Sequence, residues 1–200
     1  MYNSILAFLT PHNTRGGLIA ALIGTALLAS QVCAMPATIN LPGERAFPEN
    51  ITATSDGTLF VGSLGAGGIY RVKRHTSKSQ YWIRPGAFGS RSIFGVLADE
   101  NSNTLWACSN DLSAIGVLVA GSDSKSTLKG FDLKTGAGKV SAVLPNEHSL
   151  CNDIAVGQDG SVFVTNSAAP EILRLPPGSQ RLEVWITDSL LQAPAGAAAG

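Results

Sequence analysis

The chain has 200 residues, of which 44% are hydrophobic and 14% are charged, and its formal net charge is zero. This length and this apolar share fit one domain with a buried core. The basic residues form no cluster larger than residues 71–74, where they alternate as on a solvated strand face. The charge pattern therefore argues against a nucleic-acid partner.

The N-terminal segment has the pattern of a secretory signal. Arg15 precedes an uncharged run over residues 18–29, and residues 30–34 place Val at −3 and Ala at −1 of a cleavage site. The run is too short for a comfortable transmembrane helix. We expect residues 1–34 to be a signal peptide, with a secreted or periplasmic mature protein that has no stable membrane span. An uncleaved anchor or a lipoprotein modified at Cys33 is the alternative.

After a lead-in over residues 35–46, one sequence phrase occurs three times. It consists of a strand, a polar turn and a second strand with an aromatic residue, and it covers residues 49–63, a variant ending at 103–110, and residues 152–166. A phrase with this content that recurs at a spacing of roughly 45 to 57 residues is typical of radial all-β arrays. The repeat therefore predicts the fold and the places where a site can lie.

Within each repeat, apolar residues alternate over short runs that turn residues separate. No run after residue 34 has a helical period, and Gly and Pro interrupt the chain at short intervals. The pattern predicts four strands per repeat, at about 50–54, 58–63, 68–73 and 79–84, then 93–98, 104–109, 127–132 and 138–143, and finally 153–157, 161–166, 171–175 and 182–186.

Tandem four-stranded antiparallel units predict an all-β fold, a β-propeller. A sandwich is the alternative, but it does not explain why Phe60, Trp106 and Phe163 return at the place where blades pack together. Propellers typically close with four to eight blades, so three blades describe part of a ring. We expect a fragment, and an oligomer that completes the ring is the alternative. The expected blades are 47–90, 91–147 and 148–190, followed by a low-complexity tail over 191–200.

Two cysteines, Cys108 and Cys151, remain if export removes Cys33. They would then reside in a compartment where disulfides persist. Two cysteines at this separation are also consistent with two buried small apolar side chains. The sequence leaves their pairing open.

One face of the predicted disc gathers polar side chains from different blades. In a blade the first strand is innermost and the second returns beside it, so the start of one and the end of the other share a rim. Hard oxygen ligands there would suit Ca²⁺, Mg²⁺ or Mn²⁺, whereas the alternative is that these residues form turns. The rim residues are Glu49, Asn50, Ser63, Phe94, Ser109, Asn110, Asp111, Asn152, Asp153, Thr165, Asn166 and Ser167.

Two of these segments resemble the SMP-30/gluconolactonase/LRE-like family. They are Phe47-Pro48-Glu49-Asn50-Ile51 and the stretch from Leu150-Cys151-Asn152-Asp153 to Thr165-Asn166, and the resemblance covers most of residues 45–190. It implies a six-bladed propeller with one divalent cation, Ca, Mn, Mg or Zn, in its central channel. Glu49 matches the first-blade glutamate by place, and Asn152-Asp153 matches the third-blade Asn-Asp pair.

The resemblance implies metal-dependent hydrolysis of a small-molecule lactone or related ester. Glu49 and Asn152 are the expected metal ligands. The expected substrate-binding residues are Asp153, which would also orient the ligands, and Asn110 and Asn166.

The chain also departs from the family pattern. Leu150 stands where the family's hydrolases often have a substrate-binding arginine, and the remaining ligands and the catalytic base should lie beyond Gly200. We therefore expect the 200-residue chain alone to be inactive. The alternative function is a non-catalytic propeller of the NHL or strictosidine synthase-like kind that binds a ligand or a protein partner.

Overall fold

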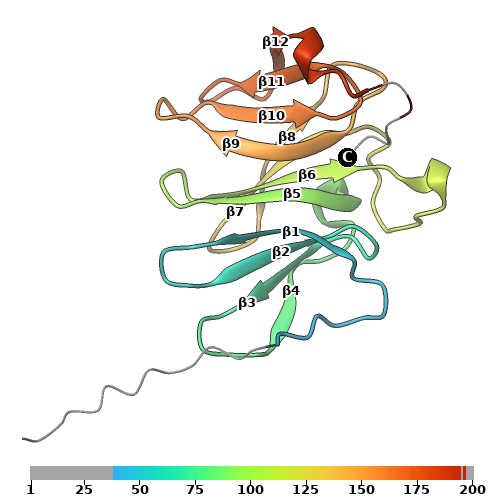
Figure 1. Ribbon diagram of the computed structural model, residues 1–200. Helices are drawn as coiled ribbons and strands as arrows, with labels where there is room; N and C mark the ends of the chain where they lie inside the picture. Colours follow the sequence, from blue (N-terminus) through green and yellow to red (C-terminus); the bar gives the residue numbers. More distant parts are fainter. Residues whose placement is uncertain (1–37, 195, 197–200) are drawn as a thin grey trace, which may run out of the picture. The chain divides into compact units, whose positions relative to one another are not determined.

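The computed structural model describes residues 38–194 and residue 196. Within this part, twelve strands form three four-stranded antiparallel sheets, and the strand order in each sheet follows the sequence (Figure 1). The predicted signal peptide, residues 1–34, lies outside the described residues. The all-β prediction is confirmed, since each sheet is a four-stranded meander, the unit from which propeller blades are built.

The strands occur close to the positions predicted from the alternating pattern. Blade 1 contains β1 (Pro48–Ala53), β2 (Leu59–Ser63), β3 (Ile69–Val72) and β4 (Ser79–Ile83). Blade 2 contains β5 (Ser92–Asp99), β6 (Thr104–Asn110), β7 (Thr127–Asp132) and β8 (Gly138–Val143). Blade 3 contains β9 (Cys151–Val156), β10 (Val162–Asn166), β11 (Glu171–Leu175) and β12 (Glu183–Thr187).

Short 3₁₀ turns accompany the connections at η1 (Ala87–Gly89), η2 (Ser113–Ile115) and η3 (Ser189–Leu191). None of the helices in the described residues is long and apolar enough to cross a membrane.

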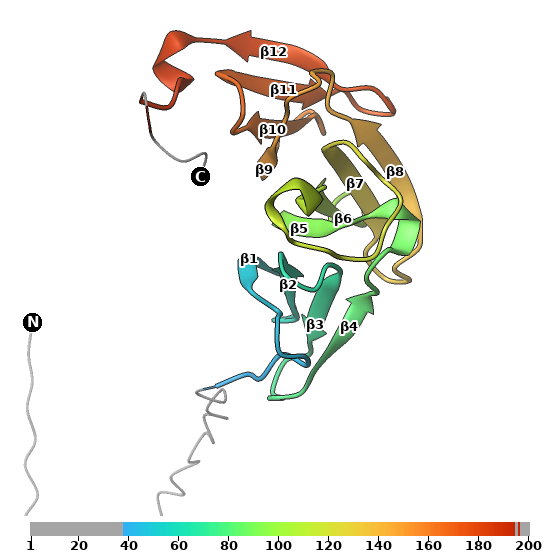
Figure 2. The ribbon, with the colours of Figure 1, turned by 90° about the vertical axis from the view of Figure 1, so that its right-hand side faces the viewer.

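The three blades pack face to face, with the first strand of each on the inner side. Figure 2 shows β1, β5 and β9 along one side and β4, β8 and β12 along the other. Contacts between β1 and β5 and between β5 and β9 join the blades along the inner side. The sheets therefore have the radial order of a partial propeller.

Two apolar clusters fill the spaces between the blades, and the repeated aromatic residue takes part in both. Phe60 of blade 1 packs with Ile93 and Leu105 of blade 2. Trp106, its counterpart in blade 2, belongs to the cluster that blades 2 and 3 share. Phe60 and Trp106 thus each pack against the next blade, as the repeat predicts.

Phe163, the third member of the series, packs differently. Its ring lies edge-to-face on Trp185 of the same blade, with the ring centroids 4.8 Å apart. Trp185 is 56% exposed, and all of β12 reaches solvent in the described part of the chain. The expectation that this aromatic packs blade against blade is therefore not met for Phe163, which packs within its own sheet.

A disulfide joins blades 2 and 3. Cys108 on β6 and Cys151 on β9 are bonded, with their Cα atoms 5.1 Å apart, and both side chains are fully buried. This Cα separation is in the usual range for a disulfide. The structure thus pairs the two cysteines whose pairing the sequence left open.

Candidate functional site

The inner strand of blade 1 carries a bulge where the candidate site was predicted. Pro48 pairs with Ser63 and Ile51 with Val61, so one more residue lies between the pairs on β1 than on β2. The bulged residues are Glu49 and Asn50. A bulge breaks the regular alternation of a strand and re-aims the side chains that it contains.

The inner strands of blades 2 and 3 carry the same irregularity at the same place. On β5 it falls between Ile93 and Val96 and contains Phe94 and Gly95. On β9 it falls between Cys151 and Ile154, opposite the register step from Asn166 to Val164, and contains Asn152 and Asp153. Three equivalent bulges therefore present Glu49-Asn50, Phe94-Gly95 and Asn152-Asp153 in neighbouring blades.

Close packing of the inner strands brings the bulges together. A Cβ atom on Gly95 would lie 2.2 Å from the backbone oxygen of Asn152 and 3.1 Å from the Cα of Asp153, so a larger residue would push β9 away. Between β5 and β1, the Val96 N–H donates to Asn50 Oδ1 at 3.4 Å, and the Ala98 N–H donates to Thr52 Oγ1 at 3.1 Å. These contacts join β1, β5 and β9.

The Asp153 carboxylate of blade 3 acts on the Glu49 carboxylate of blade 1 across blade 2. Burial raises the pKa of Glu49 above its ordinary value, and the negative charge of Asp153 raises it further. The surrounding protein thus removes part of the water from the Glu49 carboxylate, although its side chain reaches solvent. A cation near both groups would relieve this repulsion.

The Asn152 amide is held in a defined orientation. Its Nδ2 donates to Ser167 Oγ at 2.8 Å, which leaves Oδ1 as the atom able to bind a cation. Asp153 is held at two points. Its backbone N–H donates to Thr165 Oγ1 at 2.9 Å, and its side-chain Oδ1 accepts from the Ile154 N–H at 2.9 Å. The bulge therefore offers an amide oxygen and an exposed carboxylate.

Asn110 connects blade 2 to the chain that enters the third bulge. Its Nδ2 donates to the Cys151 backbone oxygen at 2.8 Å, and its Oδ1 accepts from the Cys151 N–H at 3.0 Å. The side chain is 1% exposed. Substrate binding by Asn110 stays a prediction, whereas its contacts show that it positions the residue just before Asn152.

Asn166 forms similar side-chain hydrogen bonds within blade 3. Its Oδ1 accepts from the Leu150 N–H at 2.9 Å, and its Nδ2 donates to Glu171 Oε1 at 2.8 Å. The side chain is buried. A substrate contact by Asn166 likewise stays a prediction, and the observed hydrogen bonds order the segment that leads into β9.

Several other rim residues serve local structure. Ser63 donates to the backbone oxygen of Ala46, Ser109 Oγ accepts from the Arg91 N–H, and Asp111 forms an ion pair with Arg91 at 2.6 Å. Hydrogen bonds from the Ser113 backbone and side chain lower the pKa of Asp111, and Arg91 adds to this effect. These groups follow the turn-forming alternative that the sequence left open.

The gathered groups form an incomplete set of oxygen ligands. The described residues contain no group of three or more His, Cys, Asp or Glu side chains placed to hold a metal. Two carboxylates and one amide oxygen, from Glu49, Asp153 and Asn152, are the donors that the bulges supply. Calcium takes six to eight oxygen ligands, so groups beyond these three would be needed to complete a site.

Comparison with known proteins shows the fold. No protein-family model and no curated protein matches the chain. Virginiamycin B lyase from Staphylococcus aureus is similar, with 16% identity, 76% of this chain and 44% of that chain covered, and a TM-score of 0.57. A gluconolactonase from Xanthomonas campestris, XC5397, is similar with 14% identity, 75% and 50% covered, and a TM-score of 0.53. The chain spans about half the length of these solved structures.

Proposed function

We propose that the protein to which these blades belong is an exported, divalent-metal-dependent hydrolase of a lactone or related ester, of the SMP-30/gluconolactonase/LRE-like kind. The observation that carries the proposal is the set of three equivalent bulges, which places Glu49 on β1 and Asn152 and Asp153 on β9, the two inner strands that flank β5. The gluconolactonase from Xanthomonas campestris supports it only by its similar fold. The assignment of function rests on these site residues and on the sequence resemblance.

The donor set fits a hard divalent cation. Glu49 and Asn152 Oδ1 would hold it, and the repulsion between Glu49 and Asp153 indicates a local excess of negative charge for it to neutralise. Carboxylate and amide oxygens suit Ca²⁺, Mg²⁺ and Mn²⁺, and Zn²⁺ also accepts carboxylates. When bound, such a cation polarises an ester carbonyl and lowers the pKa of a water molecule.

The chain's own residues would orient the ligands and the substrate. Ser167 holds the Asn152 amide so that its oxygen stays available, and Asn110 fixes the backbone of Cys151 just before it. The Asp153 carboxylate is exposed, and its Oδ2, the oxygen that does not accept from the Ile154 N–H, would accept a hydrogen bond from a substrate hydroxyl group. We assign no catalytic base among the residues that the structure describes.

A hydrolysis assay tests this proposal. Full-length protein would be incubated with gluconolactone in a pH-stat, before and after chelation with EDTA, and again after addition of Ca²⁺, Mn²⁺, Mg²⁺ or Zn²⁺. We expect chelation to abolish turnover and one of the cations to restore it. Loss of a group that supports a metal ligand typically lowers activity by about 10–100-fold. Asn152 is itself an expected ligand, so Asn152→Ala should reduce kcat/KM by at least this factor.

Asn101→Ala serves as the matched control, because Asn101 lies in an exposed turn away from the bulges. Turnover that survives both chelation and Asn152→Ala would contradict the proposal. Saturable lactone binding without turnover would instead support the non-catalytic propeller.

A further inference from the structure

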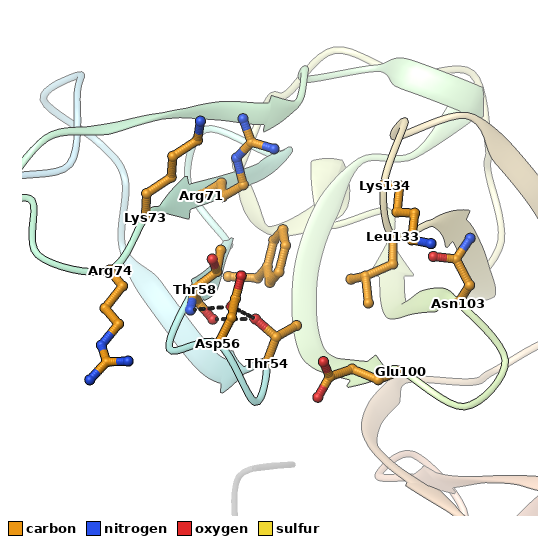
Figure 3. A pocket seen from close by; sticks show the side chains of 11 residues that line it. Thr54, Asp56, Thr58, Arg71, Lys73, Arg74, Glu100, Asn103, Leu133 and Lys134 are labelled. Carbon is orange, nitrogen blue, oxygen red and sulfur yellow. Dashed lines mark hydrogen bonds between the residues drawn. The ribbon is translucent and has the colours of Figure 1, made fainter.

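A pocket lies between blades 1 and 2, at the end of β1 opposite to its bulge. Its volume is about 640 Å³, within the range of roughly 300–1,000 Å³ that small-molecule sites occupy. Figure 3 shows Arg71 and Lys73 on one side of it and Lys134 with Asn103 on the other. The pocket is thus lined by cations from two different blades.

The two carboxylates at this pocket are already engaged by neutral donors. Asp56 Oδ1 accepts from the Thr54 hydroxyl at 2.6 Å and from the Thr58 N–H at 2.9 Å. The Glu100 carboxylate accepts from the Ser55 N–H at 2.7 Å and from the Ser55 hydroxyl at 2.8 Å. These bonds tie the carboxylates to the β1–β2 turn rather than to the cations.

The pocket lining carries more positive than negative charge, since it contains four cationic side chains and two carboxylates. Arg71, Lys73 and Lys134 have no ion pair among the residues that the structure describes. The Arg71 guanidinium lies over the Trp82 ring, 3.6 Å from its centroid, and its buried Nε has no hydrogen-bond partner there. Arg74 points away from the other cations in Figure 3. In the described part of the chain, the pocket therefore holds a fixed arginine and two lysines that form no ion pair.

The position of Arg71 on the third strand has an equivalent in each of the other two blades, and its residue or its pairing differs among the three. Arg71 lies across from the repeated aromatic residue in blade 1, and Gly130 and Arg174 hold the same register position in blades 2 and 3. At Gly130 the space is filled, because an added Cβ would lie 2.9 Å from the Trp106 ring. Only blades 1 and 3 of the described part therefore place a cation here.

In blade 3 that cation is neutralised within the blade. Arg174 forms ion pairs with Asp159 at 3.2 Å and with Glu183 at 3.5 Å. Asp159 is the repeat counterpart of Asp56, which takes its hydrogen bonds from threonines and leaves Arg71 unpaired. Among the described blades, this arginine thus forms an ion pair in blade 3 and forms none in blade 1, where it lines a pocket.

We propose that this pocket binds a small organic molecule with two negative charges, a phosphate monoester or a dicarboxylate, between Arg71 and Lys73 of blade 1 and Lys134 of blade 2. An arginine held flat on an aromatic ring presents a fork of N–H donors that matches a phosphate or carboxylate group. The lysines add charge from both sides of the pocket. The site is separate from the bulges and does not depend on the proposed hydrolase activity.

Isothermal titration calorimetry on the full-length protein at pH 8 tests this proposal, with inorganic phosphate and succinate as separate probes. We expect one of them to bind with one site per chain, and the probe that binds identifies the phosphate or the dicarboxylate class. Arg71→Gln and Lys134→Gln should each weaken that binding by about tenfold or more, because hydrogen bonds to charged groups are the stronger ones. Lys134 is exposed in a turn, so its variant keeps the test valid if Arg71→Gln disturbs the fold.

Arg174→Gln is the matched control, since it alters the same repeat position in blade 3, where the arginine is already paired. Its affinity for the probe should equal that of the wild type. The proposal is overturned if neither probe binds, or if Arg71→Gln and Lys134→Gln bind as tightly as Arg174→Gln.

Discussion

Loss of the disulfide between Cys108 and Cys151 should weaken the junction between blades 2 and 3. The bond closes a loop across a sequence separation of 43 residues. Constraint of the unfolded chain by a loop of this length contributes about 4 kcal/mol to the free energy of unfolding. Both sulfurs lie in the apolar cluster that also contains Trp106, so the double change to alanine removes buried contacts as well.

Urea unfolding followed by tryptophan fluorescence measures this effect. The wild type would be compared, with and without dithiothreitol, with the double variant Cys108→Ala/Cys151→Ala. We expect the double variant to lose about 3–5 kcal/mol, and we expect dithiothreitol to shift only the wild type. A titration of free thiols on the denatured, unreduced wild type should detect neither cysteine. Equal stability of the two proteins, or two titratable thiols, would refute the reasoning.

Three further changes test the packing around the bulges and the turns. Gly95→Ala should cost about 1–3 kcal/mol of unfolding free energy in urea, because its Cβ would overlap the Asn152 backbone; unchanged stability would contradict the close approach. Asn110→Leu should cost about 2–4 kcal/mol by leaving the buried N–H and C=O of Cys151 unpaired, and a cost equal to that of Asn101→Leu would argue against it. Hydrogen bonds from Ser161 and the charge of Arg174 lower the pKa of Asp159, so its stabilising effect should be present above about pH 4 and be lost as the pH falls further. Asp159→Asn should therefore flatten the acid limb of stability against pH, and an identical limb would exclude this contribution.

Most of the fold follows from local pattern. Alternating apolar residues and Gly-containing turns such as Ser55-Asp56-Gly57 specify strands and their ends, so the predicted and observed strands agree closely. The recurrence of Phe60 and Trp106 indicated how neighbouring sheets pack. Phe163 differs because no described blade covers its face, so the ring instead contacts Trp185.

The candidate site was only partly readable from the sequence. The rim position of Glu49 and Asn152 follows from strand order, but a bulge depends on the register between two strands, which alternation alone does not reveal. Asn110 was expected at a substrate, and its contacts to the Cys151 backbone arise from a residue distant in sequence. The sequence did contain one indication of a bulge at Gly95, because a glycine inside a strand often marks a bulge or a close backbone approach.

The central claim is that the equivalent bulges form a cation site. Calorimetric titration of the full-length protein with Ca²⁺, Mn²⁺ and Zn²⁺ tests this claim most directly. We predict that the wild type binds one of these ions and that Glu49→Gln weakens the binding strongly. Glu147→Gln, which alters an exposed glutamate outside the bulges, should bind as the wild type does. Equal affinity in the wild type and in Glu49→Gln would contradict the claim.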